Sequence, residues 1–229
     1  MLLVEAQTAN HRASPRALRV ERTVAELILN GELDAGQKLN EQEMALRLGV
    51  SRGPVREAFR TLADLGLIEI QQNRGAFVRK IDLEEAIEIH DIYSVLEELA
   101  AGTAAKRVSP REIEELASLV ESMDDAAIDD DLDEYYLLNL NFHQRLVEAS
   151  GNKRLLGTYN RLLNELHLFR RIGLMQRGEM QRSNQQHRQI LEKIVAADSD
   201  GAAEAMRIHT SQRRRQMLLG SDRFDPKAH

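Results

Sequence analysis

The hydrophobic positions at the start of the chain follow the spacing of helices. Apolar residues at i, i+4, i+7 and i+8 from Val20 onward predict an amphipathic helix that begins near Pro15 or Arg16 and ends before Gly31. The next apolar stripe predicts a second, short helix over about 41–48.

A third helix is predicted directly after a tight turn at Gly49. Ser51 suits its N-cap, and Pro54 fits the first turn of a helix but not its interior. The two faces of this helix differ in chemistry, because an apolar set lies at i, i+3, i+4 and i+7 and a basic set at i, i+4 and i+8. The apolar set is Val55, Ala58, Phe59 and Leu62, and the basic set is Arg52, Arg56 and Arg60.

After Gly66 the period changes from that of a helix to that of a strand. Ile68 and Ile70 alternate with polar residues, residues 72–75 form a turn, and residues 76–78 form the returning strand. This pattern predicts a short β-hairpin, the wing of a winged helix-turn-helix. The tip of the hairpin holds Asn73, Arg74 and Gly75.

This arrangement favours binding to double-stranded DNA. A helix with a buried underside and a basic outer face, preceded by a helix and a glycine turn, can enter a major groove. Arg52 and Arg56 lie in the first two turns, where guanidinium groups reach phosphates and guanine edges. Arg60 lies farther along, and a solvated or intramolecular role fits it equally well. The polar hairpin tip suits a minor groove or a phosphate strand.

From Asp82 onward the pattern is entirely helical. Ser109 and Glu112 form a capping box, and Asp82 with Glu85 resembles another. Further helices are expected near 132–150, 153–173, 178–197 and 200–219. Two apolar stripes precede them, Ile92, Val95, Leu96 and Leu99, and then Ile113, Leu116, Val120 and Met123. Six helices over this length predict an antiparallel bundle.

The expected fold is therefore mainly α, a winged helix-turn-helix followed by an all-helical bundle. The expected divisions are a disordered tail over 1–15, a DNA-binding domain over 16–80, a helical domain over 81–220, and a tail over 221–229.

Composition and charge agree with this division. Aromatic residues make up only 4% of the chain and there is no cysteine, which excludes disulfides, thiolate metal sites and a cysteine nucleophile. Residues 1–80 carry a net charge of +2 and residues 81–229 one of −8, within a total of −6. No segment has the length of a membrane span or the pattern of a signal peptide, so we expect a cytoplasmic protein with no membrane partner.

Three histidines are placed by periodicity on the inner faces of separate helices. His143 follows Asn139 by one turn, His187 shares the stripe of Ile190, and His209 matches the apolar offsets of the last helix. Imidazoles that converge inside a bundle can bind a divalent metal, with the Asn139 carbonyl oxygen as a further ligand. On periodicity alone, hydrogen-bonded core histidines explain the pattern as well.

The N-terminal pattern resembles the GntR family of bacterial transcription regulators. The resemblance covers about residues 18–80 and implies DNA contacts by Gln42, Ser51, Arg52 and Arg56, with the wing at Gly75. The residues that carry it are Gly31, Leu33, Gly36, Leu39 and Glu41, then Ser51-Arg52-x-Pro54-Val55-Arg56-Glu57-Ala58, then Leu62, Gly66, Leu67 and Ile68, and last Arg74-Gly75-x-Phe77-Val78.

The C-terminal pattern resembles the FCD effector domain of the FadR-type branch of that family. The matching segments are Phe142-His143, Ala149-Ser150-Gly151-Asn152-x-x-Leu155, His187-Arg188-x-Ile190-Leu191 and Ala205-Met206-x-x-His209. Many members bind a metal through Asp-x-x-x-His and two later histidines. The resemblance therefore implies a site of Asn139, His143, His187 and His209, with zinc expected and nickel or manganese as alternatives.

Two positions depart from the pattern of that branch. Asn139 replaces the commoner Asp, which removes one negative charge and predicts weaker metal binding. Tyr93 stands where members often have an Arg that clamps a carboxylate, so a standard clamp is not expected at this position.

Further effector contacts are predicted on the helix near 153–173. Asn164, His167 and Arg171 lie at i, i+3 and i+7, and either a ligand or helix packing explains them. Together with Tyr93 they are the predicted effector-binding residues. The stretches around Tyr135-Tyr136 and 164–171 are similar to a subgroup found beside phosphonate-utilisation genes, which implies a phosphonate or related small anion as effector.

These features predict a homodimeric transcription regulator, a repressor, that binds a short inverted-repeat operator and responds to a small-molecule effector. An enzymatic role is not expected. The alternative is a metal-dependent helical hydrolase with an appended DNA-binding module, for which Glu165 or Glu148 would have to act as the general base. A non-specific architectural DNA binder is disfavoured by the acidic C-terminal two-thirds.

Overall fold

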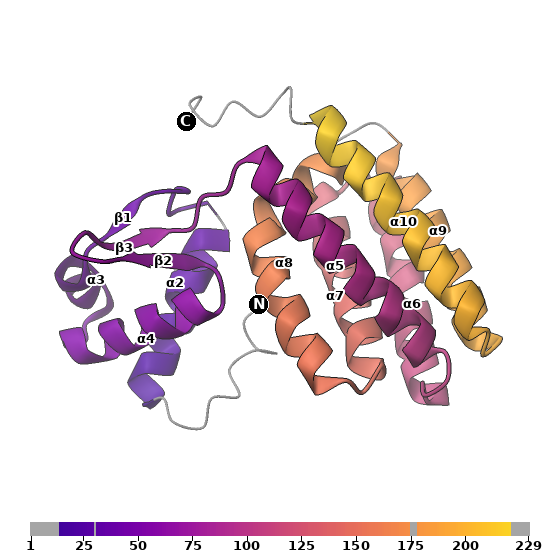
Figure 1. Cartoon of the computed structure of the whole chain (residues 1–229), viewed down its shortest axis with the longest axis horizontal. Helices are drawn as coiled ribbons and strands as arrows, with labels where there is room; N and C mark the ends of the chain where they lie inside the picture. The colour runs from indigo at the N-terminus through magenta and orange to yellow at the C-terminus, as the bar shows by residue number, and fades with distance from the viewer. Residues whose placement is uncertain (1–13, 30, 175–177, 221–229) are drawn as a thin grey trace. The chain divides into compact units, whose positions relative to one another are not determined.

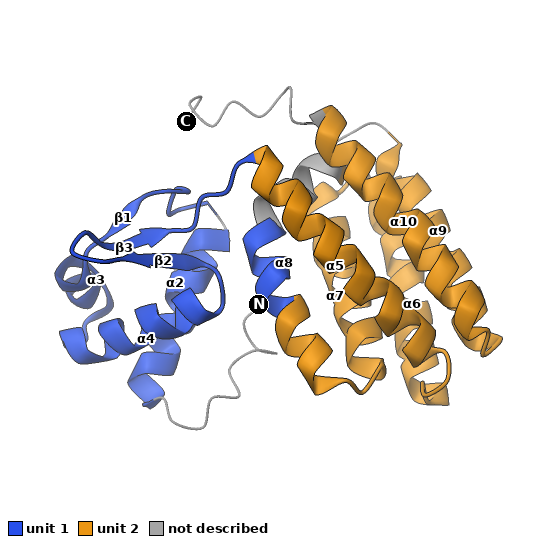
Figure 2. Ribbon diagram, viewed as in Figure 1, with its two compact units in different colours: residues 1–82, 160–167 blue, residues 83–159, 168–229 orange. Residues whose placement is uncertain are grey.

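The computed structural model describes residues 14–29, 31–174 and 178–220, and within this range the side chains of 167–173 and 220 are not described. The described residues divide into two compact units (Figure 2). The first holds the chain up to Asp82 together with Asn160–His167, and the second holds Leu83–Tyr159 and the chain from Leu168. The predicted tails over 1–15 and 221–229 lie outside the described residues, except for the last two residues of the first.

The first unit is a small helical domain with a three-stranded antiparallel sheet of order β1-β3-β2 (Figure 1). Its elements are α2 (Pro15–Leu29), β1 (Lys38–Leu39), α3 (Glu41–Leu48), α4 (Arg52–Asp64), β2 (Ile68–Gln71) and β3 (Gly75–Val78). The prediction of three helices and a hairpin is confirmed. Strand β1 was not predicted, because two residues show no alternation.

Local signals explain where α3 and α4 begin and end. The Asn40 side chain accepts hydrogen bonds from the backbone of Gln42 and Glu43, which caps α3. Gly49 ends α3 in the left-handed conformation, with φ 63°, and so makes the tight turn between the two helices. Ser51 occupies the N-cap position of α4, but its hydroxyl makes no capping hydrogen bond among the described residues.

The underside of α4 is anchored in the core of the first unit. Its four predicted apolar residues are all buried, and they pack with residues of α2, α3 and the sheet. The hairpin that follows pairs Ile68 with Val78 and Gln71 with Gly75. Burial of one face therefore holds α4 while its other face stays in solvent.

The second unit is a bundle of helices, seen around α5 in Figure 1. Helix α5 packs against α7, α9 and α10, while α6 packs against α7 and α9. The helices are α5 (Leu83–Ala104), α6 (Pro110–Ile128), α7 (Leu132–Ala149), α9 (Glu179–Val195) and α10 (Ser199–Gly220). Helix α8 (Lys153–Leu174) belongs to this unit except for Asn160–His167. The capping box of Ser109 and Glu112 is present at the start of α6. No helix in the described part of the chain is long and apolar enough to cross a membrane.

The apolar stripe predicted on α5 does not face the bundle. Ile92, Val95 and Leu99 are 58%, 61% and 53% exposed. The buried face of α5 is formed instead by Ala86, Ile89, His90, Tyr93, Glu97, Ala100, Ala101, Gly102 and Ala104. Small residues bring the neighbouring helices close on this side, and polar groups meet within the bundle. The apolar stripe therefore lies on the outer face of α5, and other residues of this helix form its buried face.

Candidate DNA-binding surface and metal centre

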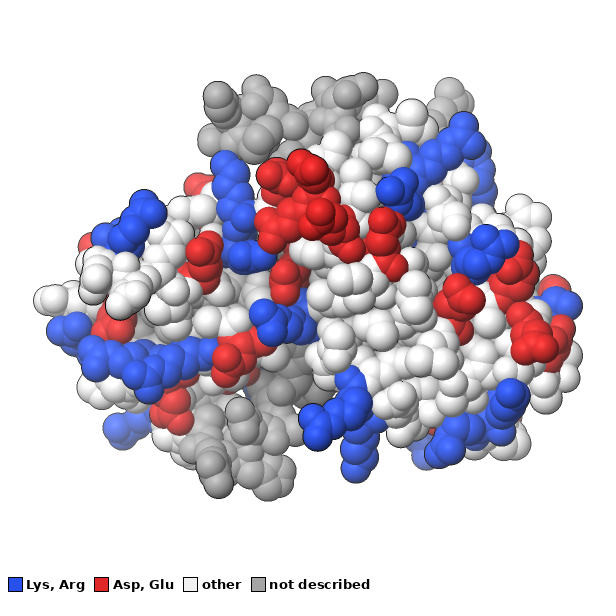
Figure 3. Space-filling model, in the orientation of Figure 1, with Lys and Arg blue, Asp and Glu red and all other residues white. Residues whose placement is uncertain are grey.

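All six predicted DNA-contacting residues are exposed. Gln42 lies in the first turn of α3, Ser51, Arg52 and Arg56 lie at the start of α4, and Arg74 and Gly75 form the wing tip. On the face drawn in Figure 3, basic and acidic side chains of the described residues lie beside one another. Solvent access is compatible with the predicted contacts, and the roles of these residues remain predictions.

The two arginines of α4 share an acidic partner on α3. The Glu41 carboxylate accepts hydrogen bonds from Arg56 Nε at 3.1 Å and Nη2 at 2.9 Å, and from Arg52 Nη2 at 3.3 Å. The hydrogen bond from Arg56 is the main reason that the pKa of Glu41 lies below its usual value. Sequence reasoning missed this cluster, although Glu41 follows the N-cap of α3.

Two cationic side chains lie near the aromatic ring of the wing. The Arg74 guanidinium lies 5.6 Å and the Lys38 Nζ 6.0 Å from the centre of the Phe77 ring. Gly75 has φ 106°, a conformation that strains other residues, so the sharp start of β3 requires glycine. The wing therefore presents positive charge at a well-defined turn.

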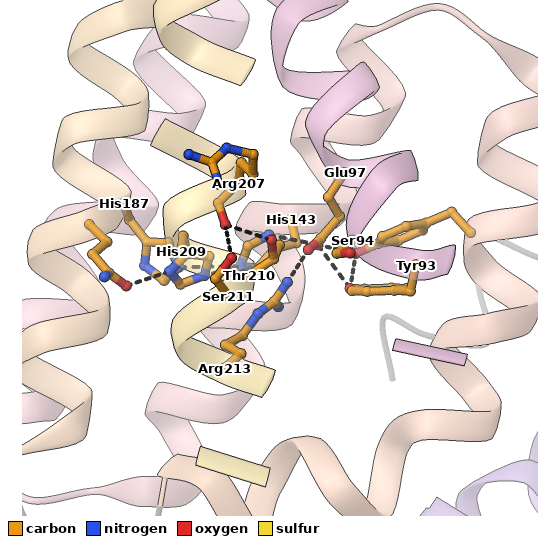
Figure 4. A network of polar contacts seen from close by, with 12 residues as sticks. Tyr93, Ser94, Glu97, His143, His187, Arg207, His209, Thr210, Ser211 and Arg213 are labelled. Atoms are coloured by element: carbon orange, nitrogen blue, oxygen red, sulfur yellow. Dashed lines mark hydrogen bonds and ion pairs between the residues drawn. The ribbon is translucent and has the colours of Figure 1, made fainter. Parts of the chain in front are cut away.

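The three predicted histidines meet in the core of the second unit (Figure 4). His143 on α7, His187 on α9 and His209 on α10 have no measurable exposure. Their candidate ligand atoms all lie within 4.8 Å of one another. His143 Nε2 lies 3.2 Å from His187 Nε2 and 3.3 Å from His209 Nε2. The prediction that the histidines converge is confirmed.

Each of the three rings has an oxygen atom beside its other nitrogen. His209 Nδ1 lies 2.8 Å from Gln186 Oε1, His187 Nδ1 3.3 Å from Asn184 Oδ1, and His143 Nδ1 2.9 Å from Glu97 Oε1. An Nδ1–H that faces its neighbouring oxygen leaves the Nε2 lone pair of each ring directed at the other two rings. Three facing acceptors repel unless a cation or shared protons lie between them.

The Asn184 amide shows how firmly one of these oxygens is oriented. Its nitrogen donates to the Val120 carbonyl at 2.9 Å and to Asp124 at 2.6 Å. Both amide hydrogens are therefore engaged, and the oxygen is left to face His187. This arrangement sets the tautomer of His187.

Asn139 lies one helical turn before His143 on the same helix. It is buried, and its Oδ1 has no hydrogen-bond partner among the described residues. An unsatisfied buried carbonyl oxygen is costly unless a cation or another donor binds it. Three imidazole nitrogens and one amide oxygen together fit a divalent metal of the zinc type.

Glu97 links the histidine cluster to a second set of polar groups that sequence reasoning missed. It accepts a hydrogen bond from the Tyr93 hydroxyl at 2.9 Å and forms an ion pair with Arg213 (Figure 4). Its carboxylate is 1% exposed and the Arg213 side chain 16%. Arg213 follows His209 by one turn, so helical spacing could have placed it beside the site.

The Arg213 guanidinium has hydrogen-bond donors that this network does not use. Its Nε and Nη1 are buried and have no hydrogen-bond partner in the described part of the chain. The guanidinium lies over the Tyr93 ring, 5.5 Å from its centre, and Tyr93 stacks on Tyr159 with ring centres 4.9 Å apart. A largely buried cation with two uncommitted nitrogens is a natural receptor for an anionic oxygen.

The four residues predicted to bind the effector lie in different surroundings. Tyr93 is fully buried beside Glu97 and Arg213, so it belongs to the polar network of the second unit. Asn164 lies within the first unit as divided above, and its amide donates to the Leu65 carbonyl at 2.8 Å. The side chains of His167 and Arg171 lie outside the described residues.

Two family patterns match the chain and together span most of it. Residues 88–212 match the FCD domain, and residues 16–78 match the family described as bacterial regulatory proteins, gntR family. Both matches coincide with the resemblances found from sequence motifs.

Individual relatives are also transcription regulators. The "Probable D-xylose utilization operon transcriptional repressor" of Paenarthrobacter nicotinovorans is 32% identical over 184 residues, which cover 80% of each chain. The "HTH-type transcriptional repressor RspR" of Escherichia coli is 27% identical over 206 residues, which cover 90% of each chain. The solved structure of E. coli McbR/YncC superposes with a TM-score of 0.75 over 93% of this chain and 100% of its own, and its 20% identity shows the shared fold alone.

Proposed function

The chain belongs to the GntR family of bacterial transcription regulators, in the branch with an FCD domain, and we propose that it is a homodimeric repressor controlled by a small anion. Regulators of this family bind DNA and small-molecule effectors, and none of the comparisons supports a hydrolase. The observation that carries the proposal is the buried convergence of three histidine nitrogens. It gives the helical domain a ligand-responsive centre.

Operator recognition is assigned to the exposed start of α4 and to the wing. Arg52 and Arg56 contact guanine edges or phosphates in a major groove, Ser51 and Gln42 contact nearby phosphates or bases, and the Arg74–Gly75 tip reaches the flanking backbone. The support is their common exposure above a buried apolar underside.

A homodimer is supported by the outer face of α5. Ile92, Val95 and Leu99 place three large apolar side chains on one exposed face, at a density that a monomer rarely leaves in water. A second copy of the chain covers this face in a self-complementary contact around a two-fold axis. Two-fold symmetry then matches two half-sites of a short inverted repeat. Replacing Val95 with Asp should yield a monomer in light scattering and weaken operator binding.

The metal centre is assigned to Asn139, His143, His187 and His209. A divalent cation held there, with zinc preferred by the imidazole donors, supplies a Lewis-acidic position for an anionic oxygen. Glu97, Asn184 and Gln186 orient the three rings from behind. Elemental analysis of the purified protein distinguishes zinc from nickel and manganese.

The effector is assigned as a small carboxylate or phosphonate. The uncommitted Nε and Nη1 of Arg213 support this class, because a planar guanidinium binds such groups with two parallel hydrogen bonds. Arg213 thereby takes the role that an Arg at the position of Tyr93 has in other members. Tyr93 orients Glu97, while the contacts of Asn164, His167 and Arg171 stay predictions from the sequence.

Control of DNA binding requires that the effector bind two states of the protein unequally. Only the difference in its affinity for the DNA-bound and DNA-free states shifts the equilibrium between them. Arg213 and the histidines join α5, α7, α9 and α10, so a bound anion acts on four helices at once.

The proposal is tested on a duplex enriched by the wild-type protein from fragments of its source genome. Arg52→Ala and Arg56→Ala should each weaken binding in fluorescence anisotropy, with unchanged thermal unfolding. Unchanged affinity in both variants rejects the DNA-contact assignment.

The effector assignment is tested with a panel of small carboxylates and phosphonates. At least one compound should release the duplex from the wild-type protein but not from Arg213→Gln. If every compound acts equally on both proteins, the effector assignment is rejected.

A further inference from the structure

Glu41 is placed between the two arginines to which operator recognition was assigned. It is the first residue of α3, and its carboxylate contacts Arg56 through two nitrogens and Arg52 through one. The arginine side chains are 54% and 59% exposed and Glu41 28%. The cluster thus lies on the recognition surface itself.

The contact with Arg56 engages one edge of the guanidinium. Nε and Nη2 both point to Glu41, and no other described residue accepts a hydrogen bond from Arg56. Nη1 and the second hydrogen of Nη2 form the adjacent, end-on edge, which matches the O6 and N7 acceptors of guanine. A flexible arginine loses side-chain entropy when it binds a base, and a carboxylate that already orients it reduces this cost.

Glu41 is not needed to start its own helix. The Asn40 side chain caps α3 through the backbone of Gln42 at 2.8 Å and Glu43 at 3.3 Å, and Glu43 supplies a further acidic residue in the first turn. The low pKa of Glu41, caused mainly by Arg56, keeps its carboxylate charged near neutral pH. A permanent anion on a DNA-binding surface requires another explanation.

We propose that Glu41 is a positioning residue that sets sequence specificity: it orients Arg56, and secondarily Arg52, toward base edges. At the same time its negative charge weakens binding to arbitrary phosphate backbone. The inference rests on the proposed DNA contacts of these arginines. The cluster carries a net charge of +1 with Glu41 present and +2 without it, and non-specific affinity depends on that charge through counterion release.

The test compares Glu41→Ala and Glu41→Gln with wild type on two probes. One probe is a duplex enriched by the wild-type protein from a random-sequence library, and the other is a shuffled duplex of the same length and composition. Glu32→Gln is the matched control, because it removes one negative charge from an exposed ion pair, with Arg47 at 3.4 Å, in the same unit. Affinity is measured by anisotropy over a series of KCl concentrations, and folding by thermal unfolding.

Glu41→Ala should bind the shuffled duplex more tightly and lower the ratio of enriched to shuffled affinity by about tenfold. The salt dependence on the shuffled duplex should steepen by about 0.9 in log–log slope, as expected for one additional phosphate contact. Glu41→Gln keeps one acceptor oxygen and should lie between Ala and wild type in the affinity ratio. Glu32→Gln should leave the ratio unchanged.

A double-variant cycle separates positioning from charge. In an Arg56→Ala background, Glu41→Ala should no longer change the affinity ratio, because the arginine it orients is gone. The inference is overturned if the Glu41 variants keep the wild-type ratio, or if they raise affinity for both duplexes equally. If Arg56→Ala and Arg52→Ala leave binding unchanged, or if wild type enriches no duplex, the underlying DNA-contact assignment fails as well.

Discussion

The two units each hold a carboxylate between nitrogen donors, but in opposite surroundings. Glu41 is partly exposed between Arg52 and Arg56, whereas Glu97 is buried between Arg213 and His143. Water competes for every partner in the first cluster and screens its charges, so the groups can exchange a carboxylate for a phosphate at little cost. In the second cluster no solvent replaces a lost partner, so each group depends on the others.

This contrast relates directly to the proposed function. A recognition surface has to release its internal contacts when DNA arrives, and exposed ion pairs do so readily. A sensing centre has to hold a fixed geometry until a specific ligand arrives, and a desolvated network does so.

The largest effect is expected from Glu97→Ala. The change leaves Arg213 buried without its counter-charge and His143 without its oriented acceptor, and it should lower the free energy of unfolding by about 3–5 kcal/mol in urea titrations. Glu97→Gln, which keeps the volume and one acceptor, provides a milder version should the alanine variant not fold. If Glu97→Ala is no more destabilising than Glu41→Ala, the two clusters do not differ in how strongly they depend on their carboxylates.

Metal removal should have the next largest effect. If free zinc exceeds its dissociation constant a hundredfold, binding stabilises the native state by about 2.7 kcal/mol, so a chelator should lower the melting temperature by roughly 5–10 °C. His143→Ala should abolish this response. His90→Ala is the matched control, since His90 is a buried histidine of the same unit outside the cluster, and it should keep the response. Equal melting of wild-type protein with and without chelator would argue against a metal centre.

A smaller change is expected from Asn139→Asp. The substitution adds a negative charge to an otherwise neutral donor set and should raise zinc affinity about tenfold, or about 1.4 kcal/mol, in competition titrations with a chromogenic chelator. Asn139→Ala should lower the affinity for zinc. If neither variant differs from wild type, Asn139 is not a ligand and the site consists of histidines alone.

The smallest effect is expected from Glu41→Gln on stability. Because Arg56 lowers the pKa of Glu41 in the folded state, the pair stabilises the protein above the usual carboxyl pKa and loses that contribution as pH falls below it. The variant should therefore be slightly less stable than wild type at pH 7, with a difference that shrinks toward pH 3.5 in urea titrations. A loss comparable to that of Glu97→Ala would show that the two clusters do not differ as described.

Much of the molecule follows from local sequence alone. The apolar spacing on α4, the turn at Gly49 and the alternation around Ile68 are local properties, and each leaves a readable signal within a few residues. The same holds for the three histidines, because helical spacing relative to Ile190 and other buried neighbours already fixes which way each side chain points. Fold class and the convergence of the three histidines could therefore be predicted.

Other features required the packed structure. On α5 the apolar residues at Ile92, Val95 and Leu99 face outward while Glu97 faces inward, the reverse of what hydrophobicity predicts. Sequence also did not pair Glu41 with Arg56, because these residues lie on separate helices. A helix's spacing determines its own faces, but which face is buried and which charges meet depends on the shape and chemistry of the elements packed against it. That information is shared between distant segments and exists only once they are brought together.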